Sequence, residues 1–174
     1  MKFSVGILSL MLLFSCGPQV FIDYDKQAQW PSAKTYGYAS EQPSGLSELD
    51  EKRLINAIDS VLSTQGYTRS TSNQLLIDFY VNETISSGRN SIGIGLGTGG
   101  GNVNVGGGVG IPIGGTVINQ AFTIEIYDTT EGYNLLWQAI IEDELKENAS
   151  PNVKDLYYTR MIEKGLQDFP PKND

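Results

Sequence analysis

Residues 120–142 have the sequence QAFTIEIYDTTEGYNLLWQAIIE. Apolar and polar residues alternate on either side of a turn-rich centre at 128–134, which is typical of two half-buried antiparallel strands joined as a hairpin. Residues 75–82, LLIDFYVN, alternate in the same way. These segments predict one sheet with a single buried face. The residues expected on that face are Leu75, Ile77, Phe79, Val81, Phe122, Ile124, Ile126, Leu135, Trp137, Ala139 and Ile141.

Two segments have the spacing of amphipathic helices. Ser47 followed by Asp50 resembles a capping box, and apolar residues then recur at helical spacing up to Gly66, which suits a left-handed C-cap. Ser150 and Pro151 suit the start of a second helix, which ends before Pro170. The residues expected on the buried helix faces are Leu54, Ile55, Ile58, Val61, Leu62, Val153, Leu156, Tyr157, Met161, Ile162 and Leu166.

A further short strand is expected at 34–38, ahead of the first helix. Together these elements predict an α+β fold. Its core is a mainly antiparallel four-stranded sheet with two helices packed on one face, in the order β-α-β-β-β-α.

A glycine-rich insertion at 88–115 contains 13 of the 20 glycines and no aromatic residue. Alternating apolar residues flank the triplet at 99–101, which predicts a β-hairpin. The segment 95–100 also fits the Gly-x-Gly-x-x-Gly pattern of dinucleotide-binding proteins, but no helix follows that could hold a pyrophosphate, so we discount it. Insertion into a membrane as barrel strands is a further alternative. The lack of aromatic residues and the presence of Pro112 count against it.

The N-terminus places one cation, Lys2, ahead of an apolar run that ends directly before Cys16, the only cysteine. This run is shorter than the roughly 20 apolar residues of a spanning helix and is typical of a secretory signal. A lone cysteine at this point indicates a lipobox, in which Cys16 carries a thioether-linked diacylglycerol. An unmodified thiol behind an ordinary signal peptide is the alternative.

The predicted organisation is therefore a lipoprotein signal peptide at 1–15, a lipidated N-terminus and tether at 16–33, and a single domain at 34–172. The apolar residues Val20, Phe21 and Ile22 suggest that the middle of the tether docks on the domain.

Composition excludes several classes of function. The chain has no histidine, which removes Ser-His-Asp and Cys-His catalytic systems and imidazole metal ligands. The formal net charge of −8 becomes −9 once Lys2 is cleaved off, and such an acidic chain opposes nucleic-acid binding. We therefore expect no catalytic residue, no cofactor and no metal. The only attached group expected is the covalent lipid on Cys16.

Carboxylates cluster at Glu142, Asp143 and Glu144 and again at Asp23 and Asp25. On a strand Glu142 and Glu144 share a face, so they could hold calcium or act as an acid–base pair. A solvated strand end explains them without any chemistry.

Four tyrosines are expected on the sheet face opposite the helices, either as an interface or as cross-strand aromatic packing. They are Tyr36, Tyr38, Tyr80 and Tyr127.

Four segments together resemble bacterial lipoproteins of the family called domain of unknown function 4136. They are FIDYD and KTYGY within 21–38, the first-helix motif at 49–67, the hairpin at 115–137, and the end of the last helix up to DFPP at 168–171. Asn73-Gln74 and Ala139 depart from the family's pattern. The resemblance implies an envelope lipoprotein and brings no catalytic residues with it.

We therefore expect a non-enzymatic periplasmic module that acyl chains anchor to the outer membrane and that contacts another envelope protein. Gly17 behind the cysteine lacks the acidic residue that commonly retains lipoproteins in the inner membrane. Two alternatives stay open. One is a small-ligand carrier or carboxylate-dependent enzyme, and the other is a pore or assembly component that uses the glycine-rich hairpin.

Overall fold

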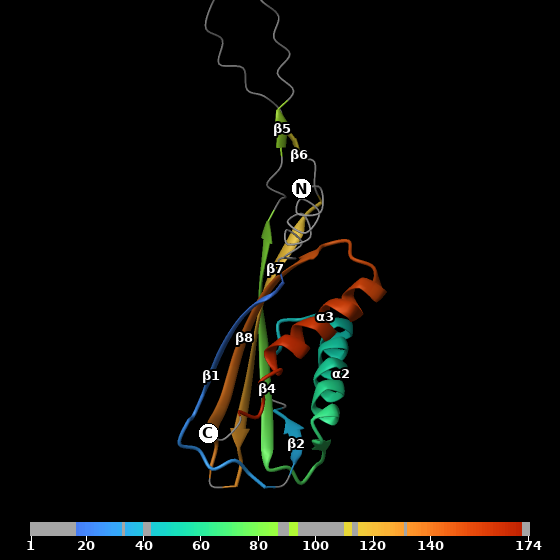
Figure 1. Cartoon of the computed structure of the whole chain (residues 1–174). Helices are drawn as coiled ribbons and strands as arrows, with labels where there is room; N and C mark the ends of the chain where they lie inside the picture. The colour runs from blue at the N-terminus through green and yellow to red at the C-terminus, as the bar shows by residue number, and fades with distance from the viewer. Residues whose placement is uncertain are drawn as a thin grey trace, which may run out of the picture.

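The computed structural model describes residues 17–32, 34–39, 43–86, 91–93, 110–112, 115–130 and 132–171 (Figure 1). Cys16, the predicted signal peptide and the Gly-x-Gly-x-x-Gly segment lie outside these residues. The elements are β1 (Gln19–Tyr24), β2 (Thr35–Tyr38), α2 (Glu48–Thr64), β3 (Thr68–Arg69), β4 (Leu75–Ser86), β5 (Ser91–Gly93), β6 (Gly110–Pro112), β7 (Val117–Asp128), β8 (Asn134–Lys146) and α3 (Pro151–Gly165).

The main sheet has six strands in the order β1-β8-β7-β4-β2-β3, so the expected four-stranded, mainly antiparallel sheet is wrong. β1, which was interpreted as part of a tether, pairs antiparallel with β8 from Gln19–Glu142 to Tyr24–Trp137. β2 runs parallel to both β3 and β4. The parallel pairing follows from α2, because a helix that connects neighbouring strands returns the chain to the end of the sheet where it started.

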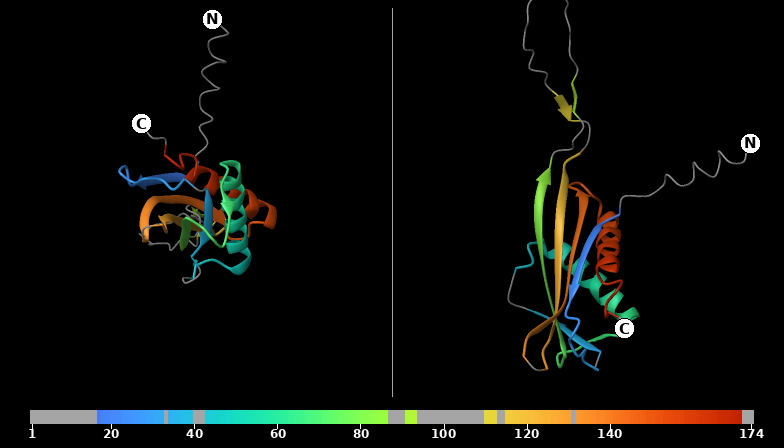
Figure 2. Two further views of the ribbon diagram at one scale, coloured as in Figure 1. Left: turned by 90° about the horizontal axis from the view of Figure 1, so that it is seen from below. Right: turned by 60° about the vertical axis from the view of Figure 1, so that its left-hand side comes forward.

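Both helices lie on the same face of the sheet (Figure 2). The strand residues that alternate toward them form the core, in which Ile77, Ile124 and Trp137 are almost fully buried. α2 begins as expected, with the Ser47 hydroxyl accepting a hydrogen bond from the Asp50 amide at 3.3 Å. It ends at Gly66, whose φ of +84° is the left-handed conformation that glycine adopts without strain.

Three apolar residues predicted to be buried are exposed. Val153 and Leu156 on α3 are 51% and 72% exposed, because the buried stripe of this helix runs through Tyr158, Met161 and Ile162 instead. Leu135 is 41% exposed, because a β-bulge in the pairing of β7 with β8 shifts the alternation at the start of β8.

The described part of the glycine-rich insertion is a two-stranded ladder that continues the register of the main sheet. Ser86 on β4 pairs with Val117 on β7, and Ser91 on β5 pairs with Pro112 on β6, five residues further along each strand. Hairpin pairing is therefore present at the base of the insertion, as its alternation predicts. The glycine triplet expected to form the turn lies outside the described residues.

Candidate contact surface

The sheet face opposite α2 and α3, here called the helix-free face, consists of cross-strand rows that the strand register defines (Figure 2). Neither α2 nor α3, the two helices in the described part of the chain, covers this face. Alternate residues of β1, β8, β7 and β4 project from this face, because successive side chains of a strand point to opposite sides. The face is therefore a regular surface of the described strands that neither α2 nor α3 covers.

An apolar row crosses the middle of the helix-free face. Phe21 pairs with Ile140, Ile140 with Thr123, and Thr123 with Tyr80, in order across the four strands. The two ends of the row are open to solvent, with Phe21 56% and Tyr80 40% exposed, whereas Thr123 is buried between its neighbours. Exposed aromatic side chains are enriched in protein interfaces and are frequent anchors there.

An acidic row lies beside the apolar row. Asp23 pairs with Gln138, Gln138 with Glu125, and Glu125 with Asp78. The Glu125 carboxylate accepts hydrogen bonds from Gln138 Nε2 at 2.8 Å and from the Tyr127 hydroxyl at 2.6 Å. The row holds no cation, so it presents negative charge to solvent.

The environment of Tyr127 reflects this charge. Burial and the hydrogen bond to Glu125 raise the pKa of the Tyr127 hydroxyl to about 12, and the nearby charge of Asp78 acts in the same direction. Tyr127 therefore stays protonated at neutral pH and serves as a hydrogen-bond donor to Glu125.

A groove of about 770 Å³ and a second of about 700 Å³ indent the surface at the two ends of the sheet. The second lies on the helix-free face, where Gln19, Asn82 and Asn119 line it together with Glu142 and Glu144. The two glutamates predicted to share a strand face are thus brought together there. Among the described residues, no three carboxylates converge closely enough to hold a metal ion.

The other predicted carboxylates do not join Glu142 and Glu144 in one site. Asp143 also lines the groove, but its carboxylate accepts a hydrogen bond from Arg160 on α3. Asp25 lies near the other end of β1, and its carboxylate accepts from the Gln27 amide at 2.8 Å. The two clusters read from the sequence therefore do not form one acid–base site.

Only two of the four predicted tyrosines lie on the helix-free face. Tyr80 and Tyr127 do, whereas the hydroxyls of Tyr36 and Tyr38 both donate to Asp59 Oδ1 of α2, each at 2.7 Å. Arg69 lies 4.7 Å from the ring centre of Tyr38 and also contacts Asp59. Burial and the hydrogen bond to Asp59 raise the pKa of both hydroxyls. This cluster joins β2 to α2 and is not available to a partner.

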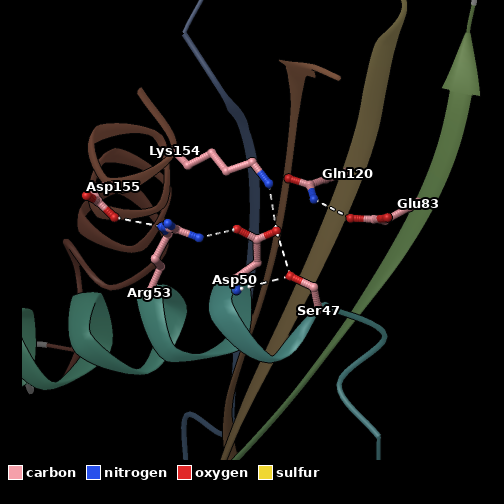
Figure 3. Close-up of polar contacts among 7 residues, drawn as sticks. All are labelled: Ser47, Asp50, Arg53, Glu83, Gln120, Lys154 and Asp155. Atoms are coloured by element: carbon pink, nitrogen blue, oxygen red, sulfur yellow. Dashed lines mark hydrogen bonds and ion pairs between the residues drawn. The ribbon is translucent and has the colours of Figure 1, made fainter. Parts of the chain in front are cut away.

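A polar cluster between the two helices is absent from the sequence-based predictions (Figure 3). Asp50 of α2 accepts hydrogen bonds from Lys154 of α3 at 2.8 Å and from Arg53 at 2.8 Å. Arg53 also donates to Asp155 of α3 at 2.8 Å. Burial acts to raise the pKa of Asp50, but the hydrogen bonds from Lys154, Ser47 and Arg53 outweigh it and lower the pKa below its usual value.

This cluster crosses the junction of α2 and α3 and every one of its charges is paired, so its geometry is that of a clamp between helices. Gln120 and Glu83 on the sheet form a separate hydrogen bond beside it (Figure 3). The capping box at Ser47 and Asp50 was visible in the sequence. Its partner Lys154 was not, because no local pattern links positions 104 residues apart.

No helix in the described part of the chain is long and apolar enough to cross a bilayer. The architecture that the described residues define is a single mixed sheet with two helices on one face and a projecting hairpin. The family model for the domain of unknown function DUF4136 matches residues 20–171, and the protein belongs to this family. No curated protein matches the chain.

Three solved structures show how far the fold is shared. A PDZ domain protein from Parabacteroides distasonis is 15% identical with a TM-score of 0.50, and the match covers 98% of this chain but 40% of that protein. A DUF4136 family protein from Bacteroides thetaiotaomicron is 17% identical, with a TM-score of 0.45 over 89% of this chain and 95% of that one. A PelC dodecamer from Paraburkholderia phytofirmans is 14% identical, with a TM-score of 0.44 over 85% and 96%. At these identities only the first similarity bears on the argument, and it concerns the fold alone.

Proposed function

We propose that this protein is a lipid-anchored lipoprotein of the bacterial outer membrane, facing the periplasm. It acts without catalysis, as a module whose helix-free face binds another envelope protein. The observation that carries the contact function is the in-register apolar row from Phe21 to Tyr80, which lies beside an acidic row on a face that the two helices leave uncovered.

The lipid anchor is supported by the sequence around Cys16. An apolar run of signal-peptide length ends at this cysteine, and the chain has no other thiol with which it could pair. Two or three acyl chains hold a protein at a bilayer far more firmly than one, since each buried methylene contributes about 0.8 kcal/mol. Gly17 supports sorting to the outer membrane, because it is not acidic.

A non-enzymatic role is supported by the arrangement of the reactive groups. The chain has no histidine, and the tyrosines with raised pKa at Tyr36 and Tyr38 are engaged with Asp59. Glu142 and Glu144 line a groove together with Asp143 and several amide side chains, and no cationic or phenolic side chain of the described residues lines it. A partner suited to the helix-free face would supply apolar side chains to the Phe21–Tyr80 row and cations to the Asp23–Asp78 row.

The contact function is tested by site-specific photo-cross-linking of the full chain in intact cells. A photoreactive amino acid at Tyr80 is expected to capture a discrete envelope protein. The matched control places it at Lys52, whose side chain is 63% exposed on α2, and is expected to capture nothing comparable. The same adducts from both positions would contradict a specific role of the helix-free face.

The anchor is tested separately by Cys16→Ala. The unaltered protein should remain with the outer-membrane fraction until detergent is added, and the variant should appear in the soluble fraction. An unacylated N-terminal peptide, identified by mass spectrometry of the membrane-associated unaltered protein, would contradict the anchor.

A further inference from the structure

The end of the sheet at which β1 begins and β8 ends carries an exposed apolar band. It is here called the proximal end and is defined by Gly17, Ile85, Val153 and Leu156, which are exposed, and by Leu145, which is buried between them. Ile85 is 68% exposed, Val153 is 51% exposed and Leu156 is 72% exposed. α2 and α3 begin beside each other, as the contact between Asp50 and Lys154 in their first turns requires.

The apolar residues of this band are neighbours. Ile85 pairs with Ile118, and Ile118 pairs with Leu145, so the row crosses three adjacent strands. Strands are spaced by about 4.8 Å, which places Ile85 about 10 Å from Leu145. Leu145 in turn lines a groove of about 840 Å³ between α3 and the end of β8, together with Val153 and Leu156. The exposed side chains of Ile85 on one side and of Val153 and Leu156 on the other thus flank the buried Leu145.

The chain upstream of the described domain leaves from the same place. Gln19 pairs with Glu142, and this register carries Gly17 level with Glu144. Glu144 lines the groove of Val153 and Leu156 and also the groove on the helix-free face that contains Gly17. Cys16 is one residue further upstream, and one residue of extended chain spans at most about 3.6 Å. A lipid attached to Cys16 therefore has almost no tether.

We propose that the proximal end rests on the surface of the lipid bilayer, with Val153 and Leu156 entering the head-group layer. This inference rests on the proposed anchor at Cys16. A bilayer held so close to Glu144 must lie against the proximal end, and exposed branched side chains bind favourably at the boundary between head groups and acyl chains. β5 and β6 continue β4 and β7 beyond this end of the sheet, so the bilayer meets the end on its α3 side, beside the two strands (Figures 1 and 2).

The charged residues at the proximal end determine whether electrostatic attraction or apolar burial holds the domain at the lipid surface. Glu144 and Glu163 line the groove together with Lys146 and Arg160, so its charges nearly cancel, and Lys154 is already paired with Asp50. Attraction to anionic head groups therefore contributes little, and the contact depends on apolar burial at a zwitterionic surface. Its consequence is a fixed orientation, because a domain held at both Gly17 and Leu156 turns Tyr133, at its opposite end, away from the membrane. The helix-free face is then presented sideways to the periplasm.

The inference is tested with the acylated full chain reconstituted in phosphatidylcholine vesicles. Leu156→Cys gives the only free thiol, since Cys16 is acylated, and it is labelled with an environment-sensitive fluorophore. Quenching by nitroxide-labelled lipid in the vesicles is expected to be several-fold stronger than for the same label at Tyr133→Cys. Tyr133 is the matched control, because it is 75% exposed in the loop between β7 and β8 at the opposite end.

A second variant tests whether the apolar side chains hold the contact. Val153→Asp combined with Leu156→Asp is expected to abolish the quenching of a label at Ile85→Cys, while Tyr133→Asp leaves it unchanged. These positions are exposed, so the fold should persist, which circular dichroism checks. In the protein that keeps Val153 and Leu156, the quenching of the label at position 85 should be the same at low and high ionic strength.

The outcomes separate the two proposals. Weak and equal quenching of both labels on protein that floats with the vesicles would overturn the orientation and leave the anchor standing. Protein with an intact Cys16 that fails to float with the vesicles would overturn the anchor itself, and the orientation with it.

Discussion

Lys154 on α3 donates a hydrogen bond at 2.8 Å to Asp50 on α2, across 104 positions of sequence. The side chains of the two residues are 25% and 13% exposed, and Asp50 also caps the first turn of its own helix through Ser47. One carboxylate therefore fixes the start of α2 and its junction with α3 together (Figure 3).

Lys154→Met should lower the free energy of unfolding by about 1–2 kcal/mol, because it removes one of the two cationic donors to a mostly buried carboxylate. Urea unfolding followed by circular dichroism measures the change. The matched control is Lys52→Met, which removes an exposed ion pair to Glu48 on the same helix and should have no measurable effect. Equal effects of the two variants would show that the junction gains nothing from Lys154.

The contribution of Asp50 should depend on pH. Its folded-state pKa lies below the unfolded value of about 3.9, so its stabilisation is complete above that value and is lost as the pH falls through the folded pKa. The unaltered protein should therefore exceed Asp50→Asn in unfolding free energy at pH 6, and the difference should shrink by pH 3. A difference that is constant across this range would contradict the depressed pKa.

Tyr36 and Tyr38 should make the protein less stable in alkali. Burial and the shared bond to Asp59 raise the folded pKa of both hydroxyls above the unfolded value of about 10. Their stabilisation is therefore complete below pH 10 and is lost as the pH rises from there toward the folded values. Between pH 8 and pH 11 the unaltered protein should lose more unfolding free energy than the Tyr36→Phe, Tyr38→Phe double variant. Equal losses in the two proteins would show that the hydroxyls of Tyr36 and Tyr38 do not contribute to the pH dependence of stability.

Gly45 and Gly132 should respond differently to the same substitution. Both have positive φ, +83° and +108°, which is strained for alanine and costs about 1–2 kcal/mol. At Gly132 a new Cβ would meet nothing within 4 Å, whereas at Gly45 it would overlap the Val81 carbonyl oxygen. Gly45→Ala should therefore lower the melting temperature by clearly more than Gly132→Ala does. Similar shifts would mean that the backbone beside β4 relaxes around the methyl group.

The paired strands were predictable to a useful extent from the sequence. The alternation in β4, β7 and β8 identified most of the core, including Ile77, Ile124 and Trp137. The capping box at Ser47 and the glycine at position 66 correctly marked the ends of α2. The buried face of α3 was predicted only in part. Tyr157, Met161, Ile162 and Leu166 are buried as expected, whereas Val153 and Leu156 are exposed, because all of these residues fit a helical stripe. Only contact with the sheet selects among them.

The candidate contact surface was predicted only in part. Tyr80 and Tyr127 were correctly assigned to the uncovered face, whereas Tyr36 and Tyr38 were not, because β2 pairs parallel to β4 with their side chains toward α2. Phe21 was hidden in a segment interpreted as a tether. β1 is short and its partner β8 is more than 110 residues away, so no local pattern shows that they pair.

The sequence by itself determined the family, the strand and helix periodicities, and the chemical classes that a chain without histidine cannot use. These properties depend on residue identity and on backbone geometry over a few neighbouring positions. The tertiary structure alone decided the order of the six strands in the sheet, the contact of Asp50 with Lys154, and the exposure of Leu135, Val153 and Leu156. Each of these depends on which element, distant in the sequence, packs against a given face of a strand or helix. That packing is set by the burial of apolar surface across the whole fold.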